Sequence, residues 1–148
     1  MGGTKSQAAS KLDHEVGDLL LQLMESMRDR FFATATDLGL TPTQATALHT
    51  LDEPCPMREL AANIGHDASH VTAIVDKLES QGLVERQADP HDRRVKRLSL
   101  TVDGRALKER LVADLFDGLP AIDRLSVAQR RDLRDLLRVA VGEAPPTS

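Results

Sequence analysis

One expected helix starts with short side chains, most of them polar, and carries a lysine further along. These residues are Ser69, His70, Thr72, the small Ala73 and Lys77. Near the N-terminal end of a helix, hydroxyl and imidazole groups can hydrogen-bond to base edges and phosphates in a DNA major groove. No activated nucleophile, glycine-rich phosphate loop or pair of catalytic carboxylates accompanies them. We therefore expect a protein that binds a partner through these side chains, not an enzyme, and we expect no cofactor.

A basic segment follows this helix. Residues 84–97 hold five basic and three acidic residues, whereas the whole chain has a net charge of −4. A local basic element on an acidic body is compatible with binding a polyanion at one face. An arginine inserted into a narrow minor groove gains from the negative potential there. The candidates for contact with DNA here are Arg86, Asp92, Arg93, Arg94 and Lys96.

Each candidate in the basic segment has an expected role. Arg93 and Arg94 lie at the tip of a polar loop, and Asp92 is close enough to brace one of their guanidinium groups by a bidentate pair. Lys96, and with it Arg97, is expected nearer the phosphates. Arg86 is expected to support the loop or a phosphate rather than read a base.

Apolar periodicity and cap signals predict the elements that position these side chains. Capping boxes at Thr41–Gln44 and Ser126–Gln129 each predict a helix start, and Gly82 predicts a helix end. Alternation of apolar and polar residues predicts two strands around the basic loop. The expected elements are a long helix over 12–38, short helices over 42–51, 57–64 and 68–81, strands over 83–86 and 95–100, a helix from 101 and a last helix from 126.

This order of elements is that of a winged helix-turn-helix. We predict a mainly α fold with a small β-wing and a DNA-binding lobe over about 41–104, flanked by helices over 11–38 and about 105–141. The long first helix suggests packing against a second chain. Residues 1–10 and 142–148 are expected to be disordered.

The segment 57–104 strongly resembles the MarR family of bacterial regulators. The family pattern is matched by Leu60-Ala61, Val71-Thr72, Val75-Asp76, Leu78-Glu79, Gly82-Leu83-Val84, Arg86, Asp92, Arg94, Leu98, Leu100-Thr101 and Gly104. The flanking helices extend the resemblance to about 12–141, and the MarR-type domain to 11–141. One departure is Ala73, where a basic residue often occurs, so base reading would shift towards Ser69, His70 and Thr72.

The resemblance implies an obligate homodimer, with N- and C-terminal dimerisation helices over 11–38 and about 105–141. This dimer would bind double-stranded DNA on a pseudo-palindromic operator, usually as a repressor. It also implies that Arg94, paired with Asp92, enters the minor groove. Small lipophilic or phenolic effectors are expected in a cleft, for which the candidates are His14, His49, Met27 and Phe31. A winged-helix module that binds protein instead of DNA is an alternative.

Cys55 is the only cysteine, so an intrachain disulfide is excluded. A redox-sensing regulator acting through Cys55 is a further alternative, although acidic neighbours and the lack of a resolving cysteine disfavour it. The five histidines are scattered, so no metal site is expected. Since no apolar run approaches a membrane span and no secretory signal opens the chain, a cytoplasmic protein without membrane contact is expected.

Overall fold

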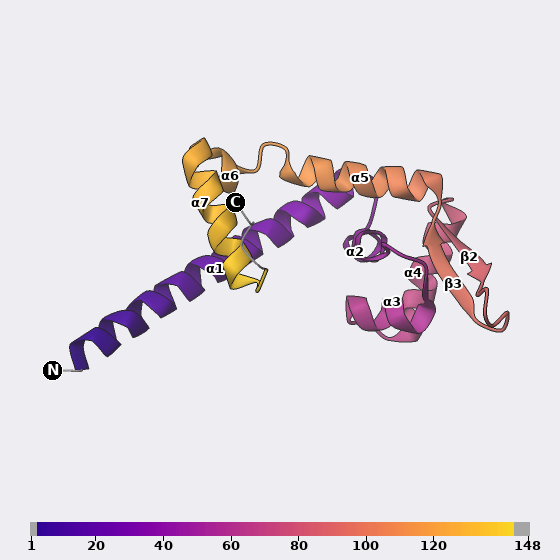
Figure 1. Ribbon diagram of the computed structural model, residues 1–148. Coiled ribbons are helices and arrows are strands. Elements are labelled where there is room, and N and C mark those ends of the chain that lie inside the picture. The colour runs from indigo at the N-terminus through magenta and orange to yellow at the C-terminus, as the bar shows by residue number, and fades with distance from the viewer. Residues whose placement is uncertain (1–2, 144–148) are drawn as a thin grey trace. The chain divides into compact units, whose positions relative to one another are not determined.

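The computed structural model describes residues 3–143, which form helices and one small sheet (Figure 1). The chain divides into two compact units, the first ending at Leu115 and the second starting at Phe116. The elements of the first unit are α1 (Gly3–Asp37), α2 (Pro42–Thr50), β1 (Cys55–Pro56), α3 (Met57–Ile64), α4 (Ala68–Ser80), β2 (Val84–Ala88), β3 (Lys96–Leu100) and α5 (Val102–Phe116), whose last residue opens the second unit. The mainly helical winged fold predicted from the sequence is confirmed. No helix in the described part of the chain is long and apolar enough to cross a membrane.

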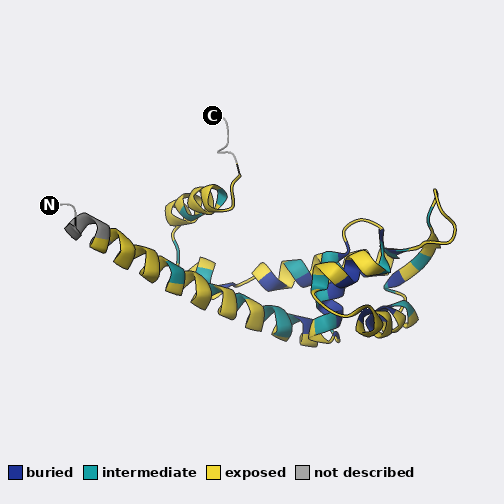
Figure 2. Ribbon diagram, turned by 90° about the horizontal axis from the view of Figure 1, so that it is seen from below, coloured by how far each residue is buried: buried dark blue, intermediate teal, exposed yellow. Residues whose placement is uncertain are grey.

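Helix α1 is 35 residues long and starts earlier than predicted. Residues 3–10, expected to be disordered, are helical, and residues 1–2 lie outside the described part. The segment before Leu12 contains no proline, so nothing in it interrupts the helical hydrogen bonds. Large apolar side chains remain exposed along α1 (Figure 2), namely Leu12, Val16, Leu19, Leu20, Leu21 and Met24.

The core of the first unit is built by α2, α3, α4, α5 and the sheet. Thr41 and Gln44 form the predicted capping box of α2, and Gly82 adopts the predicted left-handed conformation after α4 with φ 73°. The core is aliphatic, and its largest fully buried side chains are Leu48, Leu51, Leu60, Leu78, Leu98, Leu111, Val71 and Val75. This core holds α4 and the sheet as one body.

The sheet has three antiparallel strands in the order β1-β3-β2, one more than predicted. β1 pairs Cys55 with Leu98, although the sequence around Cys55 reads as a break between helices. Two residues are too few to show a period of two, so no sequence signal marks this strand. β2 and β3 form the predicted hairpin, with Val84 opposite Leu100 and Ala88 opposite Lys96.

The second unit contains α6 (Pro120–Asp123) and α7 (Val127–Ala140). Ser126 and Gln129 form the predicted capping box at the start of α7. The apolar residues Leu136, Val139 and Val141 are exposed in the described chain. Of the tail expected to be disordered, residues 144–148 lie outside the described part.

Candidate nucleic-acid interface

Helix α4 presents its polar residues to solvent and its apolar residues to the core. Val71, Ile74, Val75 and Leu78 are buried on one side. The predicted reading residues are all exposed: Ser69, His70, Thr72, Ala73 and Lys77. The start of α4 is therefore uncovered, as a helix that enters a groove requires.

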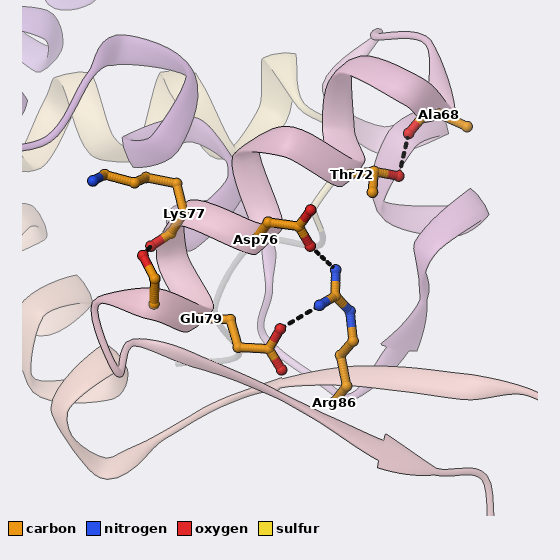
Figure 3. Close-up of polar contacts among 7 residues, drawn as sticks. Ala68, Thr72, Asp76, Lys77, Glu79 and Arg86 are labelled. Carbon is orange, nitrogen blue, oxygen red and sulfur yellow. Dashed lines mark hydrogen bonds and ion pairs between the residues drawn. The ribbon is translucent and has the colours of Figure 1, made fainter.

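Local contacts order the start of α4. The Thr72 hydroxyl donates to the Ala68 carbonyl at 2.8 Å, so its oxygen stays available as an acceptor (Figure 3). The imidazole rings of His66 and His70 stack with centroids 5.0 Å apart. Asp67 is the N-cap residue of α4 but forms no side-chain hydrogen bond to the helix.

The loop between β2 and β3 is shaped by two aspartates. Asp89 Oδ1 accepts the backbone N–H groups of His91 and Asp92 at 2.7 and 3.1 Å. The hydrogen bond from the His91 backbone is the largest cause that lowers the pKa of Asp89. Asp92 Oδ1 accepts the backbone N–H of Arg94 at 3.0 Å. Among the described contacts Asp92 pairs with no guanidinium group, so the expected bidentate brace is replaced by a turn-forming hydrogen bond.

The basic residues of the hairpin divide into two groups. Arg93, Arg94 and Lys96 are exposed and form no ion pair in the described part of the chain. Arg97 turns away from the expected phosphate position: its Nε donates to the Pro54 carbonyl at 3.0 Å, and its Nη1 pairs with Asp89 Oδ2 at 3.3 Å. Three exposed cations at this end of the hairpin are thus available to bind a polyanion. Arg97 instead connects the hairpin to the segment before β1.

Arg86 bridges the hairpin to α4. Its guanidinium group pairs with Asp76 and Glu79, both on α4 (Figure 3). The hydrogen bond that Arg86 donates to Asp76 is the largest cause that raises the pKa of Arg86. Of the two roles expected for Arg86, these contacts favour support of the wing. Two carboxylates three residues apart on one helix face were the signal for this pairing.

The expected effector residues are only partly brought together. The rings of Phe31 on α1 and His49 on α2 meet edge-on with centroids 6.0 Å apart. Met27 lies half-buried one turn before Phe31. His14 hydrogen-bonds to the Ser10 carbonyl at 2.6 Å and lies 17 residues before Phe31, about 25 Å along the same helix. His14 therefore lies apart from the other three within one chain.

Cys55 lies in β1 with its side chain buried. Burial, and then the nearby carboxylate of Glu59, raises the pKa of the Cys55 thiol above its usual value. A redox-sensing thiol needs the opposite, a lowered pKa and access to oxidant. The geometry thus disfavours the redox alternative. No cluster of three or more metal-ligating side chains occurs within residues 3–143.

An exposed helix after a glycine turn, followed by a hairpin with a cationic tip, defines the winged helix-turn-helix class. The family model described as "MarR family" matches residues 40–96, which include α4, β2 and the loop that leads to β3. The chain is 41% identical over 80 residues to the "Uncharacterized HTH-type transcriptional regulator YcgE" of Bacillus subtilis (strain 168). That match covers 52% of this chain and 52% of YcgE, so the chain spans about half the length of this relative.

Two solved structures extend the likeness to most of the chain. A probable transcriptional regulator from Pseudomonas aeruginosa is 34% identical with a TM-score of 0.56, over 87% of this chain and 98% of that one. A mutant of MepR from S. aureus, bound to an oligodeoxyribonucleotide, is 20% identical with a TM-score of 0.62, over 86% of this chain and 96% of that one. Residues 40–96 therefore belong to the MarR family, as the sequence pattern predicted, and most of the chain resembles transcriptional regulators of known structure.

Proposed function

We propose that the protein is a sequence-specific DNA-binding transcriptional regulator. One observation carries the proposal: Ser69, His70 and Thr72 are exposed on α4, and so are two cations of the adjoining hairpin. These cations, Arg93 and Arg94, form no ion pair with any residue that the structure describes. The helix would read a major groove, and the hairpin would reach the neighbouring minor groove. The DNA-bound MepR structure supports DNA as the partner of this fold. Such a regulator would act in the bacterial cytoplasm.

The regulator would act as a homodimer. Leu12, Leu19 and Met24 expose apolar surface along α1, and α7 carries further exposed apolar residues. Apolar surface of this extent is typical of a face that a second chain covers. A two-fold dimer would place two reading helices on half-sites one helical turn apart, about 34–36 Å.

Repression relieved by a small lipophilic or phenolic effector completes the proposal. An effector shifts binding only if it prefers one spacing of the two lobes, and such coupling is typically about 1–3 kcal/mol. Phe31, His49 and Met27 remain candidates for the effector cleft, since they lie where α1 approaches α2. His14 could join this cleft only from a second chain.

Selection of bound fragments from the genomic DNA of the organism that carries the gene tests the proposal. We expect recovery of short sites with two-fold symmetry, bound with an affinity that falls steeply with salt. A scrambled duplex of the same length and composition is the control. Equal, weak binding of selected and scrambled duplexes would contradict sequence-specific regulation and favour the protein-interaction alternative.

A further inference from the structure

A cluster of three charged residues joins α4 to the first strand of the wing. Arg86 of β2 donates from Nη2 to Asp76 Oδ1 and from Nη1 to Glu79 Oε2. The Arg86 side chain is 27% exposed, less than the carboxylate side chains of Asp76 at 57% and Glu79 at 39%. The guanidinium group therefore lies between the helix and the strand.

The cluster continues the reading face of α4. Asp76 follows Thr72 by four residues, so both lie on the same face of the helix, and Figure 3 shows them above the Arg86 guanidinium. Carboxylates at this place would repel the phosphates of a bound duplex. Arg86 offsets that charge and at the same time connects α4 to β2.

Other cations supply charge that a duplex can reach. Lys77 points away from Arg86 in Figure 3 and forms no ion pair in the described part of the chain. Arg93 and Arg94 are equally unpaired there. Both terminal nitrogens of Arg86, in contrast, are already engaged by α4.

We propose that Arg86 is a positioning residue for DNA recognition. It locks the wing to α4, so that the reading residues and Arg94 meet one duplex in a fixed register. The inference rests on the proposed DNA-binding function. The planar guanidinium fork can bind two carboxylates at once, which the point charge of a lysine does not do with the same geometry.

Arg86→Lys tests this role because it keeps the charge and removes the fork. Arg110→Lys is the matched control, because Arg110 also pairs with a carboxylate, that of Asp114, but lies on α5 outside the proposed interface. A substitution in an ion-pair network commonly affects the other members of the network as well. We therefore expect Arg86→Lys to lower the affinity for a selected duplex about tenfold. Arg110→Lys should change it no more than about twofold. Anisotropy titrations with selected and scrambled duplexes at several salt concentrations provide the measurement.

A positioning role has a signature that a merely stabilising role lacks. Affinity for the scrambled duplex and the salt slope should stay near the wild-type values in Arg86→Lys, so the ratio of selected to scrambled affinity falls. Unchanged affinity for the selected duplex would overturn the inference. Equal losses for both duplexes, matching a fall in the folded fraction measured by circular dichroism, would also overturn it.

Removal of the carboxylates gives a second test that leaves Arg86 in place. In the double variant Asp76→Asn with Glu79→Gln, positioning predicts a lower ratio of selected to scrambled affinity. Tighter binding with the ratio preserved would mean that the freed Arg86 binds phosphate, and would overturn the inference. If wild-type protein prefers no duplex, the proposed function fails. If it has a preference that both tests leave intact, only the role of Arg86 fails.

Discussion

Arg94→Ala should weaken DNA binding and also make it less dependent on salt, because a charge close to the phosphates is lost. Arg94 is exposed at the wing tip. Its backbone N–H donates to Asp92 Oδ1, and its side chain has no partner among the described residues. Each lost phosphate-proximal charge lowers the slope of log affinity against log salt by about 0.9, so a homodimer loses about 1.8. Between about 50 and 200 mM salt, a fourfold range, the fall in affinity should shrink about twelvefold relative to wild type.

The assay is an anisotropy titration of a selected duplex at four or more salt concentrations. Folding should be intact, because substitution of an exposed side chain without partners changes stability by no more than about 0.5 kcal/mol. Arg110→Ala is the control: it removes the same charge from α5, where Arg110 pairs with Asp114 on its own helix. If Arg94→Ala and Arg110→Ala gave the same slope, the wing assignment would be refuted.

Three further predictions concern the lobe itself. Gly104→Ala should destabilise the protein by about 1–3 kcal/mol in urea unfolding, because the new Cβ would lie 1.9 Å from the Leu83 carbonyl oxygen. Alanine normally favours a helix, so a stabilised variant would contradict this contact. Cys55 should react with iodoacetamide much more slowly in the folded protein than in urea, since it is buried and its pKa is raised; equal rates would contradict that. The hydrogen bond from Lys108 lowers the pKa of Asp52 below 3.8, so the ionised carboxylate stabilises the fold above that pH, and this contribution is lost as the pH falls through the lowered pKa. Asp52→Asn should therefore have a lower Tm than wild type near neutral pH and the same Tm in strong acid, and a gap independent of pH would contradict the pair.

The helices and the hairpin could be predicted from the sequence because local signals and packing agree there. The apolar row of α4 is buried as predicted, and its predicted end at residue 81 differs by one from Ser80. Capping boxes fix helix starts through contacts within four residues, which the sequence contains in full. Features of this kind need no knowledge of distant neighbours.

The remaining features depend on partners distant in the sequence. β1 exists because Cys55 meets Leu98, 43 residues later, and its two residues carry no periodic signal. Arg97 bonds to the Pro54 carbonyl across the same separation, so its sequence position next to Lys96 gave no indication that it turns inward. The N-terminal part of α1 was missed for another reason, because small polar residues suit both a helix and a disordered segment.

Residue type alone could not distinguish the arginines that are proposed to contact DNA from those that hold the wing to the rest of the lobe. Within residues 84–97 the arginines have the same charge, and what separates them is the nearest carboxylate or carbonyl. Arg86 has two carboxylates of α4, and Arg97 has Asp89 and a carbonyl, whereas Arg93 and Arg94 have none in the described chain. Asp89 and Asp92 also accept hydrogen bonds from backbone N–H groups, so the acidic residues of the wing shape its loop. An acidic protein can therefore present a cationic tip, and the partners of each charge matter more for DNA binding than the net charge of the chain.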